Sequence, residues 1–388
     1  MNTKDHPINI IIDVTRVVRR LMKGRTLTGI DRVTMAYVQH YAPIAHALVR
    51  WSGRSWVLAP AQSKALFRWL IAPGKTLTAK LLIFKGILAS SATKNKAPTF
   101  LLNTGHIGLG QSDYLRLIQK HGVKPIFFVH DLIPINYPEY CSAGEDTRHK
   151  EKMNYVLAQA HGVVTNSEAT RQELVQYAQQ TKQQLPRTEV ALLASGILTT
   201  SPGARPLEKP YFVILSTIEP RKNHLLLLQI WRSLFQRLGQ HTPHLFVIGQ
   251  RGWECENVLD LLERCHYLRE VVTEISYCQD ADLATYIHHS QALLFPSFIE
   301  GYGLPLVEAL ALGVPVIASD LPVFREIAGN TPEYIAPLDG KRWEELIIDY
   351  AQTNSVHRAA QMMRLQHFQE PTWQEHFIKV DSLLTELS

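Results

Sequence analysis

The 388-residue sequence has few cysteines, and none lies close to another. The absence of a Cys-x-x-Cys pair excludes a zinc ribbon and a disulfide framework. No apolar run approaches the ~20 residues that a membrane-spanning helix needs, and the first residues lack the plan of a signal peptide. We therefore expect a cytoplasmic protein with reduced structural thiols, at Cys141, Cys255, Cys265 and Cys278.

Acidic residues are missing from a long part of the first half. Between Asp31 and Asp113 every charged residue is Lys or Arg, and the whole chain has a net charge of +5. Ala65–Ile71 and Leu77–Leu88 mix apolar residues with cations, which favours an amphipathic element on an anionic bilayer. The alternative is an ordinary pair of core helices with solvated lysines. Segment 50–100 is thus a candidate for peripheral contact with the inner face of a membrane.

The length of the chain predicts two domains. Short apolar runs alternate with helical patterns in both halves, which is typical of α/β proteins with doubly wound parallel sheets. The expected strands are Ile8–Val14, Ile126–His130 and Gly162–Asn166 in the first half, and Tyr211–Ser216, Leu245–Gly249, Ala292–Phe295 and Val314–Ala318 in the second.

A stretch rich in turn formers separates the two halves, at Leu198–Pro210. We predict a first domain over 1–200, a linker over 201–210, a second domain over 211–367 and a separate C-terminal helical segment over 368–388. In such sheets ligands bind beyond the carboxyl ends of the strands, so the loops after the strands carry the candidate site.

The most informative of these loops runs from Glu300 to Glu308. A strand is expected before it, and Pro305 suits the first turn of a helix after it. Glycines and the free amides of a helix start favour phosphate binding. Two carboxylates about a turn apart can accept hydrogen bonds from two hydroxyl-bearing groups, such as a hexose and a ribose. The loop therefore predicts a nucleotide-sugar site; the alternative is that Glu300 caps the helix and Glu308 is solvated.

Three segments of this region, Pro296–Pro305, Glu308–Leu310 and Gly313–Ser319, resemble the donor-site signature of retaining GT-B glycosyltransferases of family 4. The resemblance implies two Rossmann-like domains facing an interdomain cleft. The first would bind the acceptor and the second the nucleotide sugar, and the C-terminal helix would cross back to the first domain. It also implies that Glu300 fixes sugar hydroxyls, that Glu308 binds the ribose, and that the diphosphate meets the amides of Gly301, Tyr302, Gly303 and Leu304.

A second loop precedes an apolar helix and places Arg221 and Lys222 at the helix start. Two cations there oppose the helix dipole, which favours an anion between them; solvated surface charges are the alternative. The resemblance assigns to Lys222 the role of steadying the departing diphosphate. Family members commonly have an arginine where this chain has Thr217, and Arg221 or Arg251 is a candidate replacement.

Four further positions have candidate roles through the resemblance. His130 would contact the donor sugar, whereas a lone histidine at a strand end is more often a satisfied polar residue. Gly29 would approach the donor phosphate, with a turn or cap as the alternative. Arg251 lies in a loop bordering the nucleotide, and Tyr277 lies where relatives hold the base.

A basic loop near the start has two interpretations. Either the loop is freely solvated, or it meets a phosphorylated or lipid-diphosphate acceptor. Asp280 and Asp282 form an Asp-x-Asp pattern, but they precede a helical pattern where aspartates act as caps. We expect no metal and no cofactor. The basic residues of the loop are Arg16, Arg19, Arg20, Lys23 and Arg25.

The expected reaction is transfer of a hexose from a nucleotide sugar, with retention, to a hydroxyl of a polysaccharide or lipid-linked oligosaccharide. GDP-mannose is the favoured donor because the turn Thr217–Asn223 resembles polysaccharide mannosyltransferases. The alternatives are UDP-glucose or another UDP-hexose as donor, a GT-B nucleotide-sugar epimerase, and a catalytically silent partner subunit. A nucleic-acid partner is not expected, because no aromatic residues alternate with the basic ones as in a nucleic-acid groove.

Overall fold

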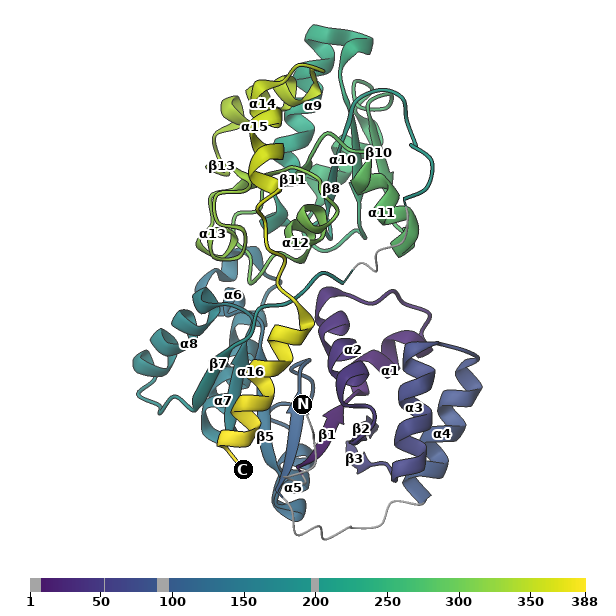
Figure 1. Ribbon diagram of the computed structural model, residues 1–388, viewed down its shortest axis with the longest axis vertical. Helices are drawn as coiled ribbons and strands as arrows, with labels where there is room; N and C mark the ends of the chain where they lie inside the picture. Colours follow the sequence, from purple (N-terminus) through teal and green to yellow (C-terminus); the bar gives the residue numbers. More distant parts are fainter. Residues whose placement is uncertain (1–7, 52, 89–97, 197–201) are drawn as a thin grey trace. The chain divides into compact units, whose positions relative to one another are not determined.

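The computed structural model describes residues 8–51, 53–88, 98–196 and 202–388, which form two compact units. Each unit is a mainly parallel sheet with helices on both sides (Figure 1). The first unit comprises Met1–Ile135, Asp146–Leu193 and Trp373–Ser388, and the second Asn136–Glu145 and Ala194–Thr372.

The first unit contains a seven-stranded sheet with the order β3-β2-β1-β4-β5-β6-β7. All neighbouring strands are parallel except β2 and β3, which pair antiparallel at one edge. The strands are β1 (Asn9–Asp13), β2 (Ala45–Trp51), β3 (Arg54–Val57), β4 (Thr99–Asn103), β5 (Lys124–Val129), β6 (Gly162–Thr165) and β7 (Arg187–Val190). The helices are α1 (Thr15–Met22), α2 (Gly29–Tyr41), α3 (Pro60–Ile71), α4 (Thr76–Leu88), α5 (Ser112–His121), α6 (Ile133–Asn136), α7 (Glu145–Gln159), α8 (Glu168–Gln180) and α16 (Trp373–Glu386).

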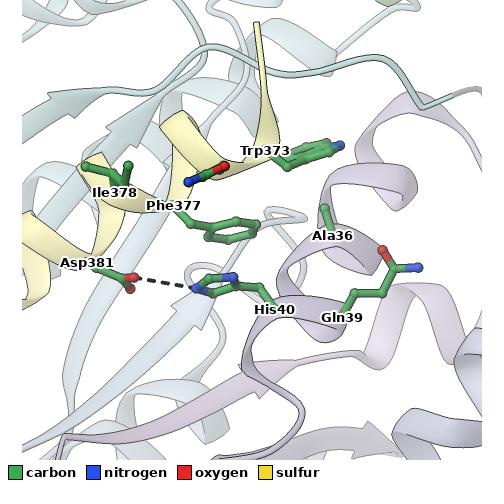
Figure 2. A pocket seen from close by; sticks show the side chains of 8 residues that line it. Ala36, Gln39, His40, Trp373, Phe377, Ile378 and Asp381 are labelled. Atoms are coloured by element: carbon green, nitrogen blue, oxygen red, sulfur yellow. Dashed lines mark ion pairs between the residues drawn. The ribbon is translucent and has the colours of Figure 1, made fainter. Parts of the chain in front are cut away.

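Helix α16 comes from the end of the chain and packs on α2 of the first unit. Its His376 is buried between the carbonyl of Leu192 and the hydroxyl of Tyr37, each 3.0 Å from a ring nitrogen, and burial lowers the pKa of His376 to about 4. Figure 2 shows a pocket of about 450 Å³ along the two helices, where the ring of His40 stacks on Phe377 with centroids 3.9 Å apart. The last helix is therefore an integral part of the first unit.

The second unit contains a six-stranded, wholly parallel sheet with the order β10-β9-β8-β11-β12-β13. The strands are β8 (Tyr211–Leu215), β9 (His244–Ile248), β10 (Val272–Ile275), β11 (Leu293–Phe295), β12 (Val316–Ser319) and β13 (Glu333–Ile335). The α-helices are α9 (His224–Leu238), α10 (Glu256–Arg264), α11 (Asp280–His288), α12 (Leu304–Ala311), α13 (Pro322–Ala328), α14 (Gly340–Ala351) and α15 (Val356–Leu365). The short 3₁₀ helices are η1 (Pro138–Tyr140), η2 (Pro220–Lys222) and η3 (Gly239–His241).

The strand order of the second unit defines where a ligand binds. Counting from β8, successive strands run toward one edge through β9 and β10 and toward the other through β11, β12 and β13. The order reverses between β8 and β11, and in open parallel sheets ligands bind outside the carboxyl ends of the strands at such a switch point. The loops that follow β8 and β11 therefore frame the candidate site.

The predicted doubly wound α/β architecture is confirmed. Each predicted strand is present, with ends within two residues of the prediction. Six strands were not predicted: β2, β3, β4, β7, β10 and β13. Two of these, β3 and β7, have no buried residue, because they lie at the edges of the first sheet. Such strands lack the continuous apolar run that marks a central parallel strand.

One segment lies in a different unit from the domain in which the sequence placed it. Segment Asn136–Glu145, placed by the sequence in the first domain, belongs to the second unit. The ring of Tyr140 in this segment stacks on Phe298, with centroids 5.4 Å apart and planes 7° apart. The chain leaves the first unit after Leu193 and returns to it at Trp373, where α16 begins. Ser201, where the predicted linker begins, lies outside the described residues.

Candidate functional site

Lys222 stands in the loop after β8, where η2 leads into α9. The next residue, Asn223, adopts the left-handed conformation with φ of 56°. The side-chain amide of Asn223 donates hydrogen bonds to the carbonyl of Pro296 (3.2 Å), in the loop after β11, and to that of Pro337 (2.9 Å), after β13. The first of these bonds ties the β8 loop to the loop after β11. A backbone bond from the Phe298 amide to the Arg221 carbonyl, 2.8 Å long, reinforces the connection. The two loops at the switch point are therefore held as one piece.

Four charged side chains meet between these loops. Glu300 accepts hydrogen bonds from the Lys222 ammonium and from Nη1 of Arg221 at 2.9 Å. The hydroxyl of Ser297 donates a third bond to Glu300 at 2.8 Å. On the other side of the guanidinium, Nε of Arg221 pairs with Glu219 at 2.6 Å. Two cations and two carboxylates thus form one balanced cluster.

The environment shifts the pKa values of this cluster in different directions. Burial by itself raises the pKa of Glu300, but the nearby charges of Lys222 and Arg221 outweigh it and lower that pKa to about 2. Burial and the adjacent Arg221 lower the pKa of Lys222, while Glu300 opposes them. Burial raises the pKa of Glu219 against the pull of the two cations. Glu300 therefore stays ionised, and its charge opposes the lowering of the Lys222 pKa by burial.

The loop after β11 depends on Gly303, which ends it and caps α12. Gly303 has φ of 123°, a value that residues with a side chain rarely adopt. A Cβ atom there would lie 2.7 Å from Cε1 of Phe324, a ring that stacks on Phe295 of β11 at 4.8 Å. The loop comes this close to the core only because residue 303 is glycine.

Substitution of Gly303 is expected to be costly. Gly303→Ala should destabilise the protein by at least about 2 kcal/mol, because it adds backbone strain to a collision with Phe324. Gly313→Ala is the matched control: Gly313 also has a positive φ, of 73°, but no atom lies within 4 Å of the added methyl. That control should cost only about 1 kcal/mol. Thermal unfolding of the two variants measures the difference, and equal melting temperatures would contradict the packing argument.

Neither alternative interpretation of the two glutamates agrees with the structure. The residue that precedes α12 is Gly303, without a side-chain cap, and Glu300 binds Lys222 instead. Glu308 is only 3% exposed and is not a solvated residue. Tyr302 is also buried, and Leu304 begins the helix. The roles of Glu300 and Glu308 toward a sugar and a ribose stay predictions.

The structure distinguishes the two candidate replacements for the arginine that the family has at Thr217. Thr217 is exposed just beyond β8. The backbone of Arg251 pairs with Ile218 beside it, but its guanidinium binds Glu274 twice, at 2.8 Å, and Glu263 at 2.5 Å. Each guanidinium is thus paired with two carboxylates, but only Arg221 shares one of its carboxylates, Glu300, with Lys222.

Other predicted residues of the second unit lie near its surface. Tyr277, expected at the nucleotide base, follows β10 and is 65% exposed. Asp280 and Asp282 lie in the first turn of α11, as expected of residues that complement a helix dipole. Across the described parts of the chain, no group of three or more His, Cys, Asp or Glu side chains is arranged to hold a metal ion.

His130 and Gly29 belong to the first unit. His130 follows β5 and is 6% exposed; its Nε2 lies 2.7 Å from the carbonyl of Thr104, to which it donates, and burial lowers its pKa. The neutral imidazole is therefore favoured. The next residue, Asp131, accepts a hydrogen bond from the Ile133 amide at 3.1 Å, a pattern typical of a turn-forming aspartate.

Gly29 is the first residue of α2, directly after the cap residue Thr28. The helix start is closed by Asp31, which accepts from the Thr28 amide at 2.8 Å. Asp31 also pairs with Arg16 at 2.8 Å and with Arg20 at 3.0 Å. Both arginines lie on α1 and not in the loop that the sequence predicted. They hold the start of α2 and are not freely solvated.

Three residues of the cluster were not singled out from the sequence. Ser297, Glu219 and Asn223 take part in it through hydrogen bonds and charge. Each lies within four residues of Lys222 or Glu300, so their closeness in sequence to these two residues could have pointed to them. Polar residues are common in any loop, however, and closeness in sequence does not by itself show which of them contact the site.

Comparison with known proteins places the loop cluster in a defined family. Residues 200–359 match the family described as glycosyl transferases group 1. This part of the chain belongs to that family. The match covers both cluster loops, and it confirms the resemblance to glycosyltransferases; membership of family 4 and retention of configuration stay predictions.

Curated relatives of the chain are named as mannosyltransferases. The serotype-specific mannosyltransferase WbdA of Escherichia coli is 27% identical over 256 residues, 60% of this chain and 31% of WbdA. The O-antigen chain mannosyltransferase B of E. coli is 28% identical over 254 residues, 63% of this chain and 66% of that protein. The chain thus spans about a third of WbdA and just under two thirds of mannosyltransferase B.

Solved structures extend the comparison to both units. Anabaena HepE, in complex with UDP and glucose, superposes with a TM-score of 0.66 at 14% identity, covering 97% of this chain and 99% of HepE. At this identity the likeness concerns the fold alone. It confirms the predicted GT-B fold for the chain.

Proposed function

We propose that the protein is a glycosyltransferase that moves a hexose from a nucleotide sugar to an acceptor hydroxyl. The observation that carries the proposal is the joined cluster of Lys222, Arg221 and Glu300 at the switch point of a group 1 glycosyl transferase domain. Buried cations that face a helix start suit a diphosphate. A carboxylate beside them suits the hydroxyls of the attached sugar.

In this proposal the protein accelerates the reaction mainly by electrostatic stabilisation of the transition state. Lys222, together with the amides of Gly301–Leu304, would stabilise charge as it develops on the departing diphosphate. Arg221 would supply the second positive charge in place of the family arginine. Glu300 would pass from its ion pairs to the hydroxyls of the bound hexose, and Glu308 would bind the ribose. Front-face attack with retention is part of the proposal.

GDP-mannose is the proposed donor, since two relatives are named as mannosyltransferases. Their names also favour a growing surface polysaccharide as acceptor, or its lipid-linked precursor. HepE, whose structure contains UDP and glucose, is the specific reason to retain a UDP-hexose as the second candidate donor. The proposed location is the cytoplasm, with peripheral contact to a membrane.

A thermal-shift screen against GDP, UDP, ADP and their hexose conjugates tests the donor. A ligand that binds only the folded protein at one hundred times its Kd stabilises it by about 2.7 kcal/mol. We expect GDP and GDP-mannose to raise the melting temperature and the other bases to leave it unchanged. A response to UDP compounds alone would move the donor to a UDP-hexose. The absence of any response would overturn the proposal in favour of a silent partner subunit.

An epimerase is distinguished by a second assay. A GT-B epimerase consumes nucleotide sugar without an acceptor, whereas a transferase needs an acceptor to release nucleoside diphosphate at full rate. Donor turnover measured with and without an oligosaccharide acceptor separates the two. Turnover that does not depend on acceptor would contradict the transferase.

A further inference from the structure

Helix α4 in the first unit has an inner face that packs against neighbouring elements. Ala79 and Ile83 on this face are buried, at 0% and 7% exposed. A Cβ atom at Gly86 would lie 2.9 Å from Cδ2 of Leu58, so the helix approaches the start of α3 closely. Figure 1 shows α3 and α4 side by side. This face is sufficient to hold α4 in the fold.

The opposite face of α4 is apolar as well. Leu77, Leu81 and Phe84 are 65%, 50% and 61% exposed. Their spacing of four and three residues aligns them on one side of the helix. We call these three side chains the α4 ridge. Single exposed apolar residues are ordinary, but three large ones in a row on one helix mark an interaction surface.

Lysines flank the α4 ridge on both sides. At 3.6 residues per turn, Lys80 projects about 60° to one side of Leu77 and Lys85 about 80° to the other. Both lysines are exposed. An apolar strip with a cation on each side is consistent with a helix that lies in a membrane interface, with the strip in the acyl boundary and the cations at the phosphates.

The neighbouring helix adds cations of the same kind. Lys64, Arg68 and Ile71 of α3 line a groove of about 250 Å³. The sequence from 32 to 112 contains no Asp or Glu that would repel an anionic surface. Across the described part of the chain, no helix is both long and apolar enough to cross a bilayer. The contact is accordingly one of a surface and not of a span.

We propose that the α3–α4 pair docks on an anionic lipid bilayer, with the α4 ridge inserted at the headgroup boundary and Lys80 and Lys85 on lipid phosphates. The choice of a bilayer over a protein partner rests on charge. The cations frame the ridge on both sides, and no acid interrupts them. A protein groove that receives an apolar helix face needs no such frame of a single sign. The inference depends on unit 1 alone and not on the donor reaction.

Vesicle flotation of the full chain tests the proposal. We expect binding to phosphatidylcholine vesicles that contain a third phosphatidylglycerol, and little binding to phosphatidylcholine alone. The double variant Leu81→Glu with Phe84→Glu should lose binding to the anionic vesicles, since it places charge in the inserted strip. Met363→Glu, at an exposed apolar residue of α15 in the other unit, is the matched control and should bind like the natural chain.

The contribution of charge has its own pair of variants. Lys80→Gln with Lys85→Gln should weaken binding about tenfold or more, given the attraction of each cation near an anionic surface. Lys120→Gln with Lys341→Gln removes the same charge at exposed positions elsewhere and should weaken it far less. Thermal unfolding confirms that each variant is folded.

Three outcomes would overturn the proposal. The first is failure of the natural chain to float with anionic vesicles, and the second is flotation of the ridge variant equal to that of the Met363→Glu control. The third is a dimer in sedimentation that the ridge substitutions dissociate, which would assign the α4 ridge to a second copy of the chain. The nucleotide thermal-shift screen is unaffected by any of these results, so failure here is distinguishable from failure of the proposed enzyme activity.

Discussion

Lys222→Ala is expected to lower turnover by about 10²–10³-fold, the typical effect of removing a group that stabilises transition-state charge. The ammonium is buried and lies in the loop at the switch point, where the diphosphate would leave. In the variant, Glu300 keeps its bonds to Arg221 and Ser297, so the loops should stay in place. The loss should therefore appear in kcat with the fold intact.

The measurement is steady-state release of nucleoside diphosphate with saturating acceptor. Lys341→Ala, an exposed lysine of the same unit, is the control and should be fully active. Circular dichroism and thermal unfolding show whether the Lys222→Ala protein is folded. Near-natural turnover in a folded Lys222→Ala protein would remove Lys222 from the mechanism and leave Arg221 as the main cation.

Several central strands were predictable because burial on both faces demands continuous apolar sequence. β1, β5, β8 and β9 are of this kind, although β2 and β4, which are also central and mostly buried, were missed. Edge strands such as β3 are short and half-covered, and their sequences do not differ from those of loops. The place of segment 136–145 in the second unit could not be predicted either. Tyr140 of this segment stacks on Phe298, which lies 158 positions later, and such a contact leaves no pattern in the local sequence.

In the site, too, features set by neighbouring residues could be predicted, and contacts between distant residues could not. Each loop was predictable from its own residues: glycines and a helix start after β11, cations before a helix after β8. Their meeting was not, since Lys222 and Glu300 are 78 residues apart and come together through the order of the strands. The partner of Arg251 was also hidden, because Glu274 reaches it from the neighbouring strand β10.

Glu300→Gln is expected to affect both stability and turnover. Glutamine keeps the size of the side chain but leaves Lys222 and Arg221 with Glu219 as their only counter-charge in the cluster. Removal of one partner from a buried ion pair costs about 3–5 kcal/mol. The melting temperature of the second unit should fall by about 10 °C. Turnover should fall at least as far as in Lys222→Ala, since the sugar contact is lost too.

The control for Glu300→Gln is Glu344→Gln. Glu344 also pairs with an arginine, Arg237, but that pair is at the surface. Exposed pairs contribute at most about 1 kcal/mol, so this variant should melt close to the natural protein. If both variants melted alike, the cluster around Glu300 would not be the strongly coupled group that its contacts indicate.

The pH dependence of Glu300→Gln separates a charge effect from loss of packing. The pKa of Glu300 falls from its ordinary value of 4.5 to about 2 on folding, so its carboxylate stabilises the native state at pH values above 4.5. That contribution is lost as pH falls toward 2, because the native state then takes up the proton as well. The difference in unfolding free energy between the natural protein and Glu300→Gln should therefore shrink as pH falls from 5 to 2. A difference that stays constant over this range would indicate packing instead of charge.

A nucleotide adds the decisive comparison, because a diphosphate supplies the negative charge that Glu300→Gln lacks. If the cluster binds the donor diphosphate, the responsive nucleoside diphosphate should raise the melting temperature of Glu300→Gln by more than that of the natural protein, where Glu300 competes for the same cations. In Lys222→Ala the nucleotide-induced rise should be smaller than in either. Equal rises in all three proteins would place the diphosphate away from Lys222 and Arg221, and the cluster would then be a structural ion-pair network that joins the two loops.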